Sequence, residues 1–151
     1  MRIRAGGVDA LGDEPGTPAR IVTLEEIAAC RADVVIVCCC GRSAKGASAE
    51  VGEHLLGVDS IWDLPALKRN AFFVVGHDKF SRPGPRVVDG IETIAALLQF
   101  ELDDISEHST SLVLEGVLRL VVESEAPRAW HWEPVISEEA GERSASHEAT
   151  S

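Results

Sequence analysis

Residues 71–98 read AFFVVGHDKFSRPGPRVVDGIETIAALL, and the fold of the chain follows from this stretch. Its first five residues are apolar without interruption, which predicts a strand in a parallel sheet that is covered on both faces. Its last part repeats apolar side chains at helical spacing, which predicts the buried face of a helix. These side chains are Val87, Ile91, Ile94 and Leu98.

The chain before this stretch alternates helices and strands in the same way. A continuous β-branched run at residues 34–38 (VVIVC) predicts a second buried strand. Thr23 and Glu26 form a capping-box pattern, which marks the start of a helix. Helices are predicted at residues 24–31, 44–56 and 62–68, the last of them capped by Asp63. The order predicts an α/β fold with a mainly parallel sheet flanked by helices.

Composition bounds the class of protein and its division into parts. A chain of 151 residues, 45% of them apolar, is long enough for one domain with a proper core. The net charge of −11 argues against nucleic-acid binding by the bulk surface, and no apolar run approaches the ~20 residues of a membrane span. We expect an α/β binding domain at residues 1–100, a helical or extended segment at 101–123, and an acidic, disordered tail at 124–151. Within the tail, Trp130-His131-Trp132 is expected either to dock onto the domain, the favoured interpretation, or to bind a partner.

The cysteines and the N-terminal residues bear on localisation without deciding it. Cys38, Cys39 and Cys40 end a strand, where reduced thiols are more typical than disulfides. Successive side chains on a strand point to opposite faces, so these three thiols do not form one tetrahedral metal site. Cysteine usage therefore favours a reducing, cytoplasmic compartment. No apolar segment follows Arg2 and Arg4, so we expect no secretory signal peptide.

Cations crowd the loop between the strand and the helix of the opening stretch. Lys79, Arg82 and Arg86 stand near the start of the helix, where its exposed N–H groups make a plausible seat for an anion. Pairing of these cations with carboxylates of the same chain is the alternative. The loop lies at the carboxyl end of its strand, the edge at which open α/β sheets bind ligands.

Two patterns point to enzymatic chemistry instead. Residues 41–48 (GRSAKGAS) follow a strand and open a helix as a phosphate-binding P-loop does. Alanine occupies the position of the P-loop lysine, however, which argues against nucleotide hydrolysis. Cys40 or Ser43, with His77 and Asp78, would supply a nucleophile, a base and an orienting group if the fold brought them together. We expect no enzymatic activity and no metal site, since the five histidines show no ligand spacing.

Four short segments carry a family resemblance. They are residues 5–9 (AGGVD), 33–41 (DVVIVCCCG), 62–66 (WDLPA) and 80–86 (FSRPGPR). In order and spacing, from about residue 5 to residue 100, they resemble the C-terminal lobe of the substrate-binding proteins that serve ABC importers of cobalamin and iron-siderophores. The resemblance implies a single Rossmann-like lobe, followed here by a C-terminal extension.

The resemblance also implies roles for individual residues. It implies that Asp78 and Arg82 line the ligand cleft, with Phe80 between them packing on an apolar ligand edge. Cys40 and Gly41, on the neighbouring loop, are expected to contact the ligand as well. Lys79 and Arg86 would support the anionic part of the site. The ligand implied is cobalamin, a ferric siderophore or haem, and no resident cofactor is expected.

A partner surface is implied by the same resemblance. Glu25, at the start of the first helix, looks like the acidic residue that docks onto an arginine pocket of the importer's membrane subunits. The N-terminal lobe of the family has no counterpart in this sequence, so a partner lobe is expected to complete the cleft. The family is extracytoplasmic. A degenerate phosphate-binding domain, and a scaffold that acts through its C-terminal tail, are the alternative functions.

Overall fold

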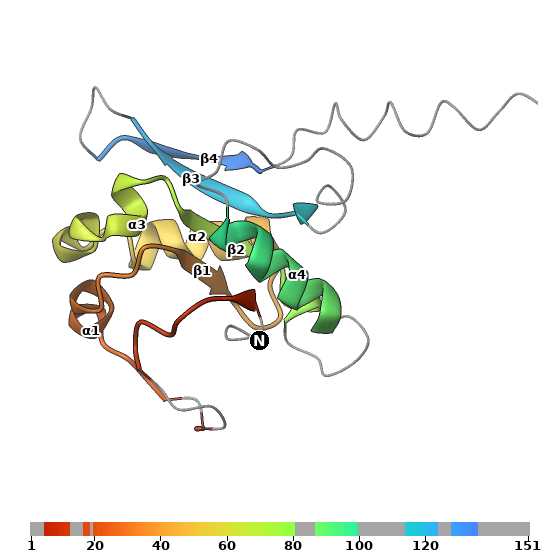
Figure 1. Ribbon diagram of the computed structural model, residues 1–151. Helices are drawn as coiled ribbons and strands as arrows, with labels where there is room; N and C mark the ends of the chain where they lie inside the picture. The colour runs from red at the N-terminus through yellow and green to blue at the C-terminus, as the bar shows by residue number, and fades with distance from the viewer. Residues whose placement is uncertain are drawn as a thin grey trace, which may run out of the picture.

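The computed structural model describes residues 5–12, 17–18, 20–80, 87–99, 114–123 and 128–135. They form an α/β fold around one four-stranded sheet (Figure 1). The elements are α1 (Leu24–Ala29), β1 (Val35–Cys38), α2 (Ala44–His54), η2 (Asp59–Asp63), α3 (Pro65–Lys68), β2 (Phe72–Val75), η3 (His77–Lys79), α4 (Val87–Leu98), β3 (Leu118–Val122) and β4 (Trp130–Pro134), η denoting a 3-10 helix.

The sheet is mixed, and the expectation of a mainly parallel sheet is wrong. Its strand order is β1-β2-β3-β4. Only β1 and β2 run parallel, with Val35 opposite Phe72, whereas β2–β3 and β3–β4 are antiparallel. Parallel neighbours need a crossover connection, which α2, η2 and α3 supply between β1 and β2. The few residues between β3 and β4 are too short for a crossover, so these strands form an antiparallel pair.

Helices cover both faces of the sheet, which gives three layers (Figure 1). On one face, Phe72 and Val74 pack with α2, α3 and their neighbours. On the other face, Phe73 and Val75 pack with α4 through Leu97. All four β2 side chains are buried, as the uninterrupted apolar run predicts for a strand covered on both faces.

The boundary of the folded part lies beyond residue 100, because β3 and β4 pair into the same sheet as β1 and β2. The expectation of a disordered tail from residue 124 is wrong at residues 130–134, which form β4. Docking of the tail tryptophans is confirmed: the ring of Trp132 lies 6.3 Å from that of Phe72. Trp130 meets Trp132 edge-on at 6.1 Å. Residues 124–127 and 136–151 of the tail lie outside the described part of the chain.

Two local expectations fail for identifiable reasons. Asp63 does not cap α3, because it is the last residue of η2; Leu64 takes the cap position and Pro65 starts the helix with a preset φ. The buried stripe of α4 is centred on Gly90, Thr93, Ile94 and Leu97. Of the four side chains expected there, Ile94 is buried, and the other three are half-buried at the margins of the stripe.

Candidate functional site

The loops that follow β1 and β2 are tied together at one edge of the sheet. Since the two strands are parallel, their carboxyl ends, at Cys38 and Val75, meet at the same edge. The His77 N–H donates to the Arg42 carbonyl at 3.1 Å, and His77 Nδ1 lies 3.2 Å from the same oxygen. The Cys38 thiol also reaches the Gly76 carbonyl, at 3.9 Å. These contacts fix the spacing of the two loops that carry the predicted binding residues.

Asp78 folds back over the turn that precedes it. Its side chain is exposed, yet Oδ1 lies 2.8 Å from the position that a Cβ on Gly76 would occupy. That position is also 3.9 Å from the backbone nitrogen of Ala44, the first residue of α2. The carboxylate and the start of α2 therefore both flank Gly76, and residue 76 has to lack a side chain for Asp78 to sit there.

The structure describes Phe80 but not the side chains of the predicted cations. Phe80 is half-buried and packs against the core on the α4 face. Its N–H donates to the His77 carbonyl at 3.2 Å, which closes η3. Arg82 and Arg86 lie outside the described residues, as does the side chain of Lys79.

Cys40 and Gly41 form the exposed turn of the neighbouring loop. Gly41 has φ +75°, a left-handed conformation that glycine adopts without the strain a side chain brings. Ser43 then caps α2, because its hydroxyl accepts the Gly46 N–H at 3.2 Å. Arg42 forms an ion pair with Glu50 across the first turns of the helix.

The P-loop-like and nucleophile-like residues occupy ordinary structural positions. Ser48 is buried and donates its hydroxyl proton to the Lys45 carbonyl at 2.9 Å, within α2. Lys45 is exposed on the helix. Ser43 is engaged in the cap, and His77 faces the Arg42 carbonyl.

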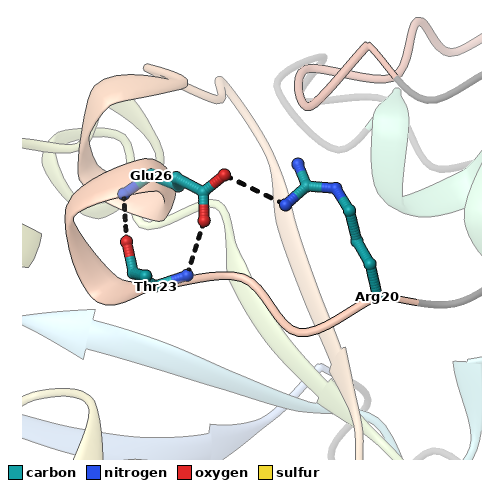
Figure 2. Close-up of polar contacts among 3 residues, drawn as sticks. All are labelled: Arg20, Thr23 and Glu26. Atoms are coloured by element: carbon teal, nitrogen blue, oxygen red, sulfur yellow. Dashed lines mark hydrogen bonds and ion pairs between the residues drawn. The ribbon is translucent and has the colours of Figure 1, made fainter.

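Glu25 and Glu26, although adjacent, have different surroundings at the start of α1. Glu26 closes the predicted capping box (Figure 2): its Oε2 accepts the Thr23 N–H at 2.8 Å, and Thr23 Oγ1 accepts the Glu26 N–H at 3.2 Å. Arg20 adds an ion pair at 3.0 Å. The Thr23 backbone N–H, followed by Arg20, lowers the pKa of Glu26. Glu25 is exposed, and within the described part of the chain no residue pairs with it.

A second feature, which the sequence analysis missed, is an apolar cavity of about 510 Å³ along the edge of β1 that faces away from β2. Its walls come from residues 7–11, α1, β1, α4 and Phe80. An apolar run on both faces of a strand predicts cover above and below the sheet, but it says nothing about the strand's edges, so the sequence carried no signal for this cavity. Among the described residues, β1 has a neighbouring strand on one side, β2.

Two further kinds of feature, a metal site and a membrane-spanning helix, are absent from the described residues. Among those residues, no three His, Cys, Asp or Glu side chains are grouped so as to hold a metal ion. No helix that the structure describes has the length and apolar character needed to span a bilayer. The chain matches no protein-family model, no curated protein and no solved structure.

Proposed function

We propose that this chain is a non-catalytic binding lobe, which holds a cobalamin-like or ferric-siderophore-like ligand against the carboxyl edge of β1 and β2. The supporting observation is the hydrogen bond from the His77 N–H to the Arg42 carbonyl, since it holds the two edge loops in fixed register. Ligands of open α/β sheets bind at this edge. Asp78, Cys40 and Gly41 are all exposed there.

The fold proposed with this function is a Rossmann-like lobe. Its support is the β1–α2–β2 unit, in which parallel strands are joined by helices that cover one face. A lone lobe buries less of a ligand than a two-lobed cleft does, so a partner lobe belongs to the proposal. Haem is included among the ligand candidates, because its carboxylates and apolar ring would need the same combination of Arg82 and Phe80.

Glu25 is proposed as the contact to an importer's membrane subunit. The support for this is electrostatic: an exposed carboxylate in the first turn of a helix can form a charge-assisted hydrogen bond with a partner's arginine. Because Glu26 already serves the helix cap, Glu25 can be engaged by a partner without loss of the cap.

Titration of the full chain with cyanocobalamin, haemin and ferrichrome tests the binding proposal. We expect saturable binding of one of them, weakened about tenfold or more by Asp78→Ala, because a hydrogen bond to a charged group contributes about 1.5–3 kcal/mol. Asp63→Ala is the matched control, since Asp63 is also exposed but lies at the end of η2, where it contacts Lys68 at 3.8 Å. Absence of saturation by all three ligands up to about 1 mM would reject binding by this lobe.

A further inference from the structure

We infer that the outer edge of β1 accepts an extended apolar strand of a partner polypeptide, which completes the sheet and fills the cavity beside it. This inference does not rest on the proposed function: Phe80 belongs to the cavity wall as well as to the proposed ligand site, but the rest of the lining follows β1, and Asp78 does not line the cavity.

The cavity opens onto both cores of the protein. Val35 and Val37 belong to the core under α2, whereas Val34 and Ile36 belong to the core under α4. All four line the same cavity, together with Ile27 of α1 and Ile94 of α4. An occupant that contacts both cores must place alternate side chains on opposite sides of the sheet, which is what a β-strand does.

The floor of the cavity is the polar backbone of β1. Val35 donates its N–H to the Ala71 carbonyl at 3.0 Å, toward β2. Backbone groups alternate in direction along a strand, so the Ile36 N–H is directed away from β2, toward the cavity. A small apolar ligand would leave such groups without partners, whereas an added strand would bond to them.

The rim of the cavity exposes apolar surface. Val8, which lines the cavity, is 95% exposed. Its side chain adds apolar surface at the opening, which a partner can cover. A second copy of this chain is disfavoured as occupant, because each copy carries a net charge of −11. An apolar strand flanked by basic residues suits both the cavity and the charge.

Amide hydrogen exchange of the full chain, observed by NMR, tests this inference. The probe is a synthetic peptide with five alternating valines and isoleucines between pairs of lysines; its control is the same peptide with the five central amides N-methylated. We expect the unmethylated peptide to slow exchange of the Ile36 amide about tenfold or more. The Val37 amide, directed toward β2, is the internal reference and should stay protected throughout.

Variants at the rim separate strand addition from unspecific adhesion. Val8→Ser should weaken peptide binding about threefold, because it removes exposed apolar surface at the opening. Val88→Ser is the matched control, since Val88 is an exposed valine on α4 that does not line the cavity. Both residues are exposed, so neither change threatens folding.

Four outcomes would overturn the inference. If the Ile36 amide is already protected without peptide, the chain itself occupies the edge. If its protection rises with protein concentration alone, a second copy is the occupant. If the N-methylated peptide binds as well as the unmethylated one, the cavity takes apolar groups without strand pairing. If no peptide binds up to about 1 mM, the edge does not accept a strand.

Discussion

Substitution of Gly52 by alanine is expected to destabilise this protein, although Gly52 lies inside α2, where alanine is normally favoured. Alanine in place of glycine in a helix interior gains about 1 kcal/mol. Here an added Cβ would lie 2.9 Å from Cη2 of Trp130, well inside the usual 3.5–4.0 Å contact distance. Overpacking of this kind costs about 1–3 kcal/mol, so we expect a net loss of up to about 2 kcal/mol.

A double-mutant cycle with Trp130→Ala isolates this contact. Without the indole ring the clash disappears, so Gly52→Ala should stabilise that background by about 1 kcal/mol. The coupling energy between the two positions is therefore expected to be about 1–3 kcal/mol. Urea unfolding followed by far-ultraviolet circular dichroism measures it without depending on tryptophan emission.

Gly46 provides the matched control in the same helix. Its added Cβ would meet Ser43 Oγ at 3.6 Å, an ordinary contact, so Gly46→Ala should be favourable in both backgrounds. If Gly52→Ala stabilises the native chain as much as it stabilises Trp130→Ala, then β4 does not pack on α2, and the description of the sheet as four-stranded fails with it.

Three further predictions concern single residues. The fold lowers the pKa of Glu26 from 4.5, so its ionised carboxylate stabilises the protein above that pH, and this effect is lost as pH falls through the lower folded pKa. The difference in unfolding free energy between the native chain and Glu26→Gln should therefore vanish in acid, and a difference that persists would contradict the capping box. Asn70 has φ +53°, and its side-chain oxygen accepts the Val122 N–H at 3.0 Å, so Asn70→Ala should lower the free energy of unfolding by about 2 kcal/mol in urea. Asn70→Asp keeps the acceptor and should lower it less; equal losses would contradict this hydrogen bond. Cys40 is the exposed thiol of the four and should react first with a disulfide reagent, with Cys40→Ser removing the fast phase; a fast phase that survives would place another thiol at the surface.

Local patterns in the sequence were sufficient for the elements that depend on near neighbours. The capping box at Thr23 and Glu26 forms as predicted, because its donors and acceptors lie within one helical turn. The two uninterrupted apolar runs became β1 and β2. All four β2 residues are buried, as such a run predicts, whereas the β1 residues are half-buried and the expectation of a second buried strand is met only in part. The loops that follow β1 and β2 lie at one edge of the sheet, because the two strands are parallel.

Other features were decided by contacts between segments far apart in the chain. Val74 pairs with Leu118, and nothing within either segment specifies the direction or the register of that pairing. The placement of Trp130 depends on the small residue at position 52, which the sequence shows only as an interruption of a helix.

What the sequence by itself determined is thus the set of helices and buried strands, because hydrophobic periodicity and capping act over a few residues. The tertiary structure alone decided that β3 and β4 complete one side of the sheet, whereas a cavity borders the other side at β1. The physical reason is that a strand's backbone forms hydrogen bonds with whichever strands lie beside it in space, and its own residues do not specify which segments those are.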